Sequence, residues 1–234
     1  MSVKKEMDLF PFVKAWLEEM GCATQGEVNS IDVVGIFEDD LSIAVELKNT
    51  LNLEVICQAI DRQKRTDLVF IAVHERQGFK RSKRNRNIMQ LLTRLNLGLL
   101  SVDTTQNAVR VVKLPDYPSN AKRYVTPNQK LKQKLLKEFK SRKTNVNIGG
   151  VTRTKLMTAY RENALAVAEA IQKLDTVNLK DLQVENLSKS QISQILQKNY
   201  YKWFERVMRG KYTLSVQGKN AVLAHQQLTN DSKH

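Results

Sequence analysis

The sequence predicts an α/β protein in which helices flank a mixed sheet, followed by a second and smaller domain. Within residues 1–114, segments with an apolar residue every three or four positions alternate with short runs rich in Val, Ile, Leu and Phe. These two patterns are typical of helices and of buried strands. Residues 115–127 hold three of the four prolines and predict a linker. Beyond the linker, several helical segments precede a hairpin pattern, which indicates a separate domain.

The predicted first domain covers residues 1–115 and centres on a hairpin. Apolar strands at 31–37 and 41–48 flank an acidic triplet at 38–40, and so short a turn favours a hairpin. Both strands are apolar on both faces, so we expect them to be central in the sheet and covered on both sides. The other predicted elements are a helix at 6–20, a helix at 51–65, a strand at 67–73, a helix within 77–94, a strand at 98–102 and an edge strand at 108–114.

The rest of the chain is predicted to form a basic connection and a winged helix-turn-helix domain. Residues 116–150 comprise the linker and a Lys-rich amphipathic helix at 128–142. Residues 151–225 are expected to follow the order helix, helix, helix, hairpin, which is typical of a winged helix. Its elements are helices at 152–174, 179–185 and 188–199, a hairpin at 203–216 and a short helix opened by Gly218. Residues 226–234 are polar and are expected to form a flexible tail.

The charge of the chain points to a polyanionic partner. The 234 residues carry a formal net charge of +14, which suits nucleic acid or an anionic membrane surface. Residues 1–78 hold 8 basic and 14 acidic residues, whereas residues 79–234 hold 30 and 10. No apolar run approaches the ~18 residues of a membrane span, and the first six residues lack the apolar stretch of a signal peptide. We therefore expect a cytoplasmic protein that binds nucleic acid and no membrane. Its two cysteines, Cys22 and Cys57, are expected to be reduced core residues.

Two carboxylates and an ammonium group are predicted to converge at one end of the first hairpin. If the turn is centred on Asp39, Asp32 lies opposite Glu46, and Lys48 shares their face. Facing carboxylates repel one another unless a cation lies between them, and Mg²⁺ or Mn²⁺ prefers such oxygen ligands. A bound ion would acidify an attacking water, and Lys48 would position that water or stabilise charge on a phosphate. An exposed Glu–Lys pair with Asp32 in a turn is the alternative; the apolar strands count against it.

These residues resemble the signature of the PD-(D/E)XK nuclease superfamily. Asp32, Glu46 and Lys48 match its three positions, and Ile31 stands in the place of its proline. The resemblance implies a restriction-endonuclease-like fold, with a core of helix, three strands, helix and strand. It also implies that the backbone carbonyl of Leu47 binds the metal ion together with the carboxylates of Asp32 and Glu46.

A closer resemblance is to a family of uncharacterised bacterial proteins described as PD-(D/E)XK phosphodiesterases. It is carried by residues 53–63, by Glu27-Val28 and by the segment 209–214, and it covers most of the chain. Gln58 matches a polar position that often supports the metal site in the superfamily. Glu27, on an expected first strand, is a candidate further ligand, and Arg62, one helical turn after Gln58, is a candidate supporting residue. An ordinary surface acid and a solvated helix face remain open for these positions.

Basic and polar residues in two places are expected to contact nucleic acid. The first set is a run of five cations within seven residues, whose mutual repulsion favours nearby phosphates. It comprises Lys80, Arg81, Lys83, Arg84 and Arg86. The second set lies on the expected recognition helix and wing and comprises Gln191, Gln194, Lys198, Arg209 and Lys211. The Lys-rich helix is open to two interpretations, a solubilising face and a phosphate-binding one.

Together these features predict a Mg²⁺- or Mn²⁺-dependent phosphodiesterase, specifically a deoxyribonuclease acting on double-stranded DNA. Cleavage of two strands would suit a homodimer or a larger complex. Two alternatives remain open. One is a catalytically silent DNA-binding regulator. The other is a nuclease subunit of a larger defence, repair or transposition complex.

Overall fold

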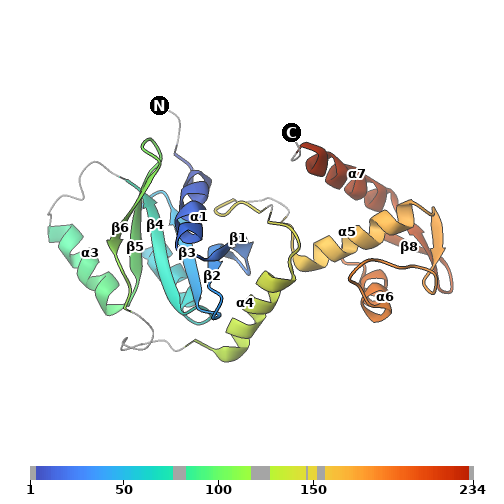
Figure 1. Cartoon of the computed structure of the whole chain (residues 1–234), viewed down its shortest axis with the longest axis horizontal. Helices are drawn as coiled ribbons and strands as arrows, with labels where there is room; N and C mark the ends of the chain where they lie inside the picture. Colours follow the sequence, from blue (N-terminus) through green and yellow to red (C-terminus); the bar gives the residue numbers. More distant parts are fainter. Residues whose placement is uncertain (1–3, 76–82, 117–126, 146, 152–155, 232–234) are drawn as a thin grey trace. The chain divides into compact units, whose positions relative to one another are not determined.

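The computed structural model describes residues 4–75, 83–116, 127–145, 147–151 and 156–231. The chain divides into two compact units, Met1–Leu156 and Met157–His234 (Figure 1). Each unit has its own apolar core. None of the helices within the described ranges is long and apolar enough to cross a membrane.

The first unit is built on a six-stranded mixed sheet. Its strands are β1 (Ala23–Val28), β2 (Ile31–Ile36), β3 (Ser42–Lys48), β4 (Leu68–His74), β5 (Gly98–Asp103) and β6 (Ala108–Lys113), and they lie side by side in chain order. β1, β2 and β3 are antiparallel, β3, β4 and β5 are parallel, and β6 returns antiparallel at the edge. The predicted α/β class, the mixed sheet and the edge strand are therefore confirmed.

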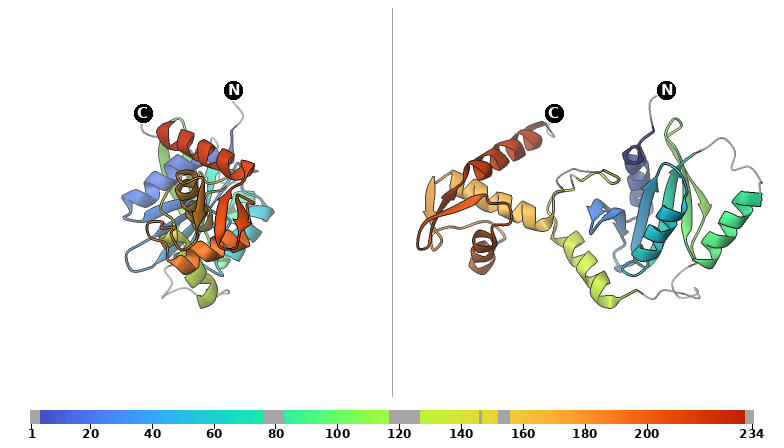
Figure 2. Two further views of the ribbon diagram at one scale, coloured as in Figure 1. Left: turned by 90° about the vertical axis from the view of Figure 1, so that its right-hand side faces the viewer. Right: turned by 180° about the vertical axis from the view of Figure 1, so that it is seen from behind.

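Helices cover both faces of this sheet. The short 3₁₀ helix η1 (Glu6–Leu9) and α1 (Phe10–Glu19) pack through one apolar cluster. α2 (Leu53–Arg62), α3 (Lys83–Arg94) and α4 (Gln129–Ser141) pack through the other, with α3 and α4 near opposite edges (Figures 1 and 2). The expectation of a buried Cys57 is wrong, because this residue lies on the outer side of α2 and is exposed.

The Lys-rich helix α4 belongs to the first unit and is not part of a separate connection. Its apolar residues Leu135, Leu136 and Phe139 are buried in the core that α2 and α3 share. Arg142, directly after the helix, donates hydrogen bonds to the carbonyls of Gly26 and Glu27 at 2.9 and 2.8 Å. Burial of one apolar face thus joins the helix to the edge of the sheet. The predicted boundary after residue 115 had placed the helix and the sheet in separate parts of the chain.

The second unit combines three helices with a three-stranded sheet. It contains α5 (Ala159–Gln172), β7 (Thr176–Asn178), α6 (Lys189–Lys198), β8 (Phe204–Met208), β9 (Lys211–Leu214) and α7 (Val216–Asp231), with the sheet in the order β7-β9-β8. The predicted second hairpin and the helix predicted at 188–199 are confirmed; the helix is capped by Ser188, whose side chain accepts from the Gln191 amide.

Three expectations for this unit are corrected. The helix predicted from 152 begins at Ala159 after the N-cap Thr158, and residues 152–155 lie outside the described ranges. The segment 179–185 forms turns in place of a helix, since the Leu179 amide donates to the Gly210 carbonyl of the hairpin at 2.8 Å. The final helix is longer than expected, so the predicted tail at 226–234 is helical as far as Asp231.

Candidate active site

The hairpin of β2 and β3 has the register expected from a turn centred on Asp39. Val33 pairs with Val45, and Ile36 pairs with Ser42. If this register is continued by one residue toward the open end of the hairpin, Asp32 lies opposite Glu46, just beyond the last strand pair, Val33–Val45. There the Asp32 carboxylate accepts a hydrogen bond from the Leu47 amide at 2.8 Å. Glu46 is 2% exposed, so its carboxylate is removed from water.

A third carboxylate extends this row onto β1. The β1–β2 register pairs Gly26 with Val33 and Val28 with Ile31, so the intervening Glu27 corresponds to Asp32. Glu27 is buried and has a φ of 53°, a backbone conformation that side-chain-bearing residues adopt rarely and at some cost. Successive strands β1, β2 and β3 therefore contribute one carboxylate each, in the order Glu27, Asp32 and Glu46.

Burial and neighbouring charge disfavour ionisation of two of these carboxylates, Asp32 and Glu27. Burial, followed by the charge of Glu46, raises the pKa of Asp32 to about 7, against the opposing effect of the Leu47 amide. Burial also raises the pKa of Glu27, which the amides of Gly150 and Val151 partly offset, while the Glu46 charge adds to the increase. Removal of a carboxyl group from water disfavours its charged form, and a like charge nearby adds to that effect. The row is therefore an acidic site in which the charged forms of Asp32 and Glu27 are disfavoured.

Two basic residues approach the row, each with a defined partner. Arg62, at the end of α2, directs Nε to the Glu46 carboxylate at 2.7 Å and donates from Nη2 to the Ser30 carbonyl at 2.6 Å. Lys48 Nζ lies 3.2 Å from the Glu6 carboxylate of η1. Burial lowers the pKa of Lys48, but the bond to Glu6 and the nearby carboxylates outweigh it, so the pKa is raised overall.

Gln58 lies one turn before Arg62 on the same helix. Its Oε1 atom is buried and, among the described residues, has no hydrogen-bond partner. A buried acceptor without a donor costs free energy, so this oxygen is available to a water or another donor that enters the site. Of the sequence-predicted supporting residues, the structure thus places Arg62 on Glu46 and gives Gln58 a free acceptor.

A strap of residues after α4, which the sequence reasoning did not identify, closes over the row. The strap comprises Arg142–Val151, of which Val146 lies outside the described ranges. The Gly150 amide donates to the Glu27 carboxylate at 2.9 Å. A Cβ atom at Gly149 would overlap the Asp32 carbonyl oxygen, so only glycine permits this approach. The Gly149-Gly150 pair was the sequence signal that could have indicated a close backbone contact.

Comparison with known families shows the family of this chain. The family model described as "Putative PD-(D/E)XK phosphodiesterase (DUF2161)" matches residues 99–221, which is more than half of the chain. This chain belongs to that family. No curated protein and no solved structure matches it. The family predicted from the sequence is therefore confirmed.

The part of the chain that the family model matches begins within β5, after β3, and includes α4 and the strap. Asp32, Glu46 and Lys48 thus precede the matched residues, whereas Arg142, Gly149 and Gly150 fall within them. The strap and the carboxylate row meet through the Gly150–Glu27 bond. The matched segment and the unmatched strands β1 to β3 are consequently in contact at the candidate site.

The donor set suits a hard divalent cation. Carboxylate oxygens are the ligands that Mg²⁺ and Mn²⁺ prefer, and the row holds three carboxylates against one ion-paired arginine. No three acidic, His or Cys side chains of the described residues are gathered closely enough to enclose an ion by themselves. A site with one or two carboxylates, a backbone carbonyl and water, which is the usual arrangement for Mg²⁺, fits this geometry.

The residues expected to contact nucleic acid lie on both units. Lys83 and Arg86 are exposed on α3, whereas Lys80 and Arg81 and the side chain of Arg84 lie outside the described part of the chain. Of the five residues predicted in the second unit, four have exposed side chains, namely Gln191, Gln194, Lys198 and Arg209, and the fifth, Lys211, is half-buried. The Gln191 side chain also accepts from the Ser188 amide at 2.8 Å, so it caps α6.

Proposed function

We propose that this protein is a metal-dependent nuclease that hydrolyses phosphodiester bonds in DNA. The observation that carries the proposal is the buried row of Glu27, Asp32 and Glu46, in which burial and the charge of Glu46 raise the pKa of Asp32 to about 7. Membership of a phosphodiesterase family supports phosphodiester hydrolysis as the reaction.

Asp32 and Glu46, with the carbonyl of Leu47, would hold Mg²⁺ or Mn²⁺. When bound, such an ion acidifies a water molecule and stabilises charge that develops on the phosphate. Lys48 would leave or share its contact with Glu6 and place its ammonium group on the attacking water or on a phosphate oxygen. Glu27 and the free acceptor of Gln58 would orient that water. Arg62 would continue to balance the charge of Glu46.

We further propose that the second unit is a winged helix that binds duplex DNA. Its described order is helix, strand, helix and hairpin, with β7, β9 and β8 in one sheet. In a winged helix, a recognition helix enters a groove and the wing contacts phosphates. α6, with Gln191, Gln194 and Lys198, would be that helix, and the turn at Arg209 and Lys211 would be the wing. Lys83 and Arg86 of the first unit would add phosphate contacts.

Cleavage of plasmid DNA in the presence of Mn²⁺ or Mg²⁺ tests the nuclease proposal. Wild type should cut, whereas Glu46→Gln and Lys48→Met should each lower the rate by about 10²-fold or more, the usual cost of removing a group that stabilises developing charge. Glu38→Gln is the matched control, because Glu38 is exposed at the other end of the same hairpin. Equal cleavage by all four proteins, or none by wild type on DNA or RNA, would contradict the proposal.

A silent DNA-binding protein, or a nuclease subunit that needs partners, is the second candidate. The observation that favours it is the 2.7 Å pair between Arg62 and Glu46, since a resident arginine neutralises a carboxylate that an active centre would offer to a metal ion. This candidate is favoured over the first if wild type and the variant Arg62→Met each bind DNA in the absence of metal ions and neither of them cleaves it.

A further inference from the structure

The helix α4 carries five lysines, and they divide into two groups. Lys132 forms an ion pair with Asp67 at 2.6 Å, and Lys140 forms one with Asp40 at 2.7 Å. For the side chains of the other three, Lys130, Lys134 and Lys137, the structure records no hydrogen bond or ion pair with any described residue. All three are exposed. We call these three residues the lysine stripe.

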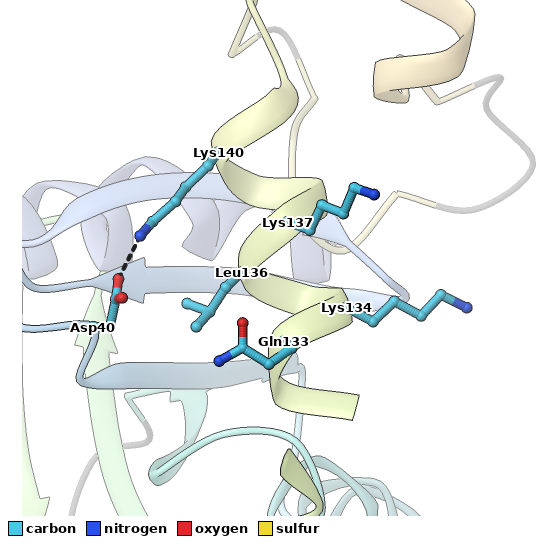
Figure 3. Close-up of a pocket in the computed structure, with 6 residues that line it drawn as sticks. All are labelled: Asp40, Gln133, Lys134, Leu136, Lys137 and Lys140. Carbon is cyan, nitrogen blue, oxygen red and sulfur yellow. Dashed lines mark hydrogen bonds and ion pairs between the residues drawn. The ribbon is translucent and has the colours of Figure 1, made fainter. Parts of the chain in front are cut away.

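The lysine stripe occupies one face of the helix. Steps of four and three residues return to the same side of an α-helix, and the seven steps from Lys130 to Lys137 span about 10 Å. Figure 3 shows Lys134 and Lys137 extending away from the strands, whereas Lys140 turns toward Asp40. Like charges at such spacing destabilise a helix by a few tenths of a kcal/mol. The lysine stripe therefore does not stabilise the helix, and an anionic partner would relieve the repulsion between its charges.

The helix is fixed to the edge of the candidate site. Arg142, one residue beyond α4, bonds the carbonyl of the site residue Glu27 at 2.8 Å. Gln25 of β1 donates to the Phe139 carbonyl at 3.0 Å. Because these contacts join α4 to β1, a chain of phosphates held by the stripe would be held in a constant relation to the carboxylate row.

We propose that Lys130, Lys134 and Lys137 bind the phosphodiester backbone of the nucleic acid on which the site acts; the inference rests on the proposed nuclease function. Lysine presents a compact point charge on a flexible stem, which suits phosphate contacts and not the reading of bases. Binding through the stripe is therefore independent of sequence. A membrane surface fits less well, because Leu135, Leu136 and Phe139 are buried in the core, and the single exposed apolar residue of α4, Leu131, does not make an apolar face that could enter lipid.

Binding of a short fluorescent DNA duplex to the full chain, measured by anisotropy in EDTA over a range of salt concentrations, tests the inference. The slope of log affinity against log salt is negative, and the triple variant Lys130→Gln/Lys134→Gln/Lys137→Gln should make it less negative by about 3, at roughly 0.9 per lost phosphate contact. The loss should be equal for unrelated sequences. The control Lys4→Gln/Lys14→Gln/Lys113→Gln removes the same charge from positions outside the proposed contact sets and should leave the slope unchanged.

The outcomes separate this inference from the nuclease proposal. A reduced slope without cleavage by wild type would support the stripe and overturn the nuclease; cleavage with an unchanged slope would overturn the stripe alone. The inference also fails if wild type does not bind the duplex, or if only vesicles containing phosphatidylserine bind in a stripe-dependent manner. Circular dichroism of the triple variant and the three single variants checks folding, and a graded loss across the singles would support the inference.

Discussion

Replacement of Asp32 by asparagine should make the metal-free protein more stable at neutral pH. The Asp32 carboxylate is buried beside Glu46, and burial and that charge raise its pKa from 3.8 to about 7. Asparagine has nearly the same shape and keeps an oxygen that can accept from the Leu47 amide. It removes the charge, and with it the repulsion within the row. The substitution should also abolish cleavage, because it removes a proposed metal ligand.

The magnitude follows from the linkage between protonation and folding. Between pH 4 and pH 7 the folded protein retains a proton on Asp32 that the unfolded chain has lost, so the free energy of unfolding falls as pH rises. A difference of about 3 pKa units corresponds to roughly 4 kcal/mol, at 1.36 kcal/mol per unit. For a chain of this size, 1 kcal/mol shifts the melting temperature by about 2–4 °C. Asp32→Asn should therefore raise the melting temperature by about 10 °C at pH 8.

Thermal unfolding of wild type, Asp32→Asn and the control Glu38→Gln in EDTA, from pH 4 to pH 8, measures this effect. The advantage of Asp32→Asn should be near zero at pH 4, grow through pH 7 and then remain constant. Added Mn²⁺ should stabilise wild type and the control but not Asp32→Asn. The reasoning is refuted if Asp32→Asn is no more stable than wild type at pH 8, or if its advantage does not depend on pH.

Two further substitutions test the surroundings of the row. Arg62→Met should destabilise the metal-free protein by roughly 3–5 kcal/mol, since it leaves the buried Glu46 carboxylate unpaired. In urea unfolding, added Mn²⁺ should stabilise this variant more than it stabilises wild type. The control Lys64→Met, at an exposed position, should change the free energy of unfolding little. Gly149→Ala should cost about 1–3 kcal/mol, because its Cβ overlaps the Asp32 carbonyl, and it should lower the rate of cleavage; wild-type stability in the same urea titration would argue against a tight strap.

The sequence alone determined the α/β class, the hairpin and its register. A turn of three acidic residues between two apolar strands leaves few ways to pair them, and the observed pairs Val33–Val45 and Ile36–Ser42 follow from a centre at Asp39. Because side chains alternate with a fixed period along a strand, that register was enough to bring Asp32 near Glu46. Local periodicity misled the prediction at 179–185, where tertiary contacts to the hairpin hold turns in place of a helix.

The tertiary structure decided what surrounds those carboxylates. Glu27 joins the row through the register of β1, Arg62 reaches Glu46 from the end of α2, and Gly150 reaches Glu27 from a strap more than 100 residues further along the chain. Such contacts leave no periodic trace, because each depends on how whole elements pack and not on the preferences of neighbouring residues. The sequence thus determines that Asp32 faces Glu46, whereas packing determines that Glu27 joins them and which cations, amides and glycines surround all three.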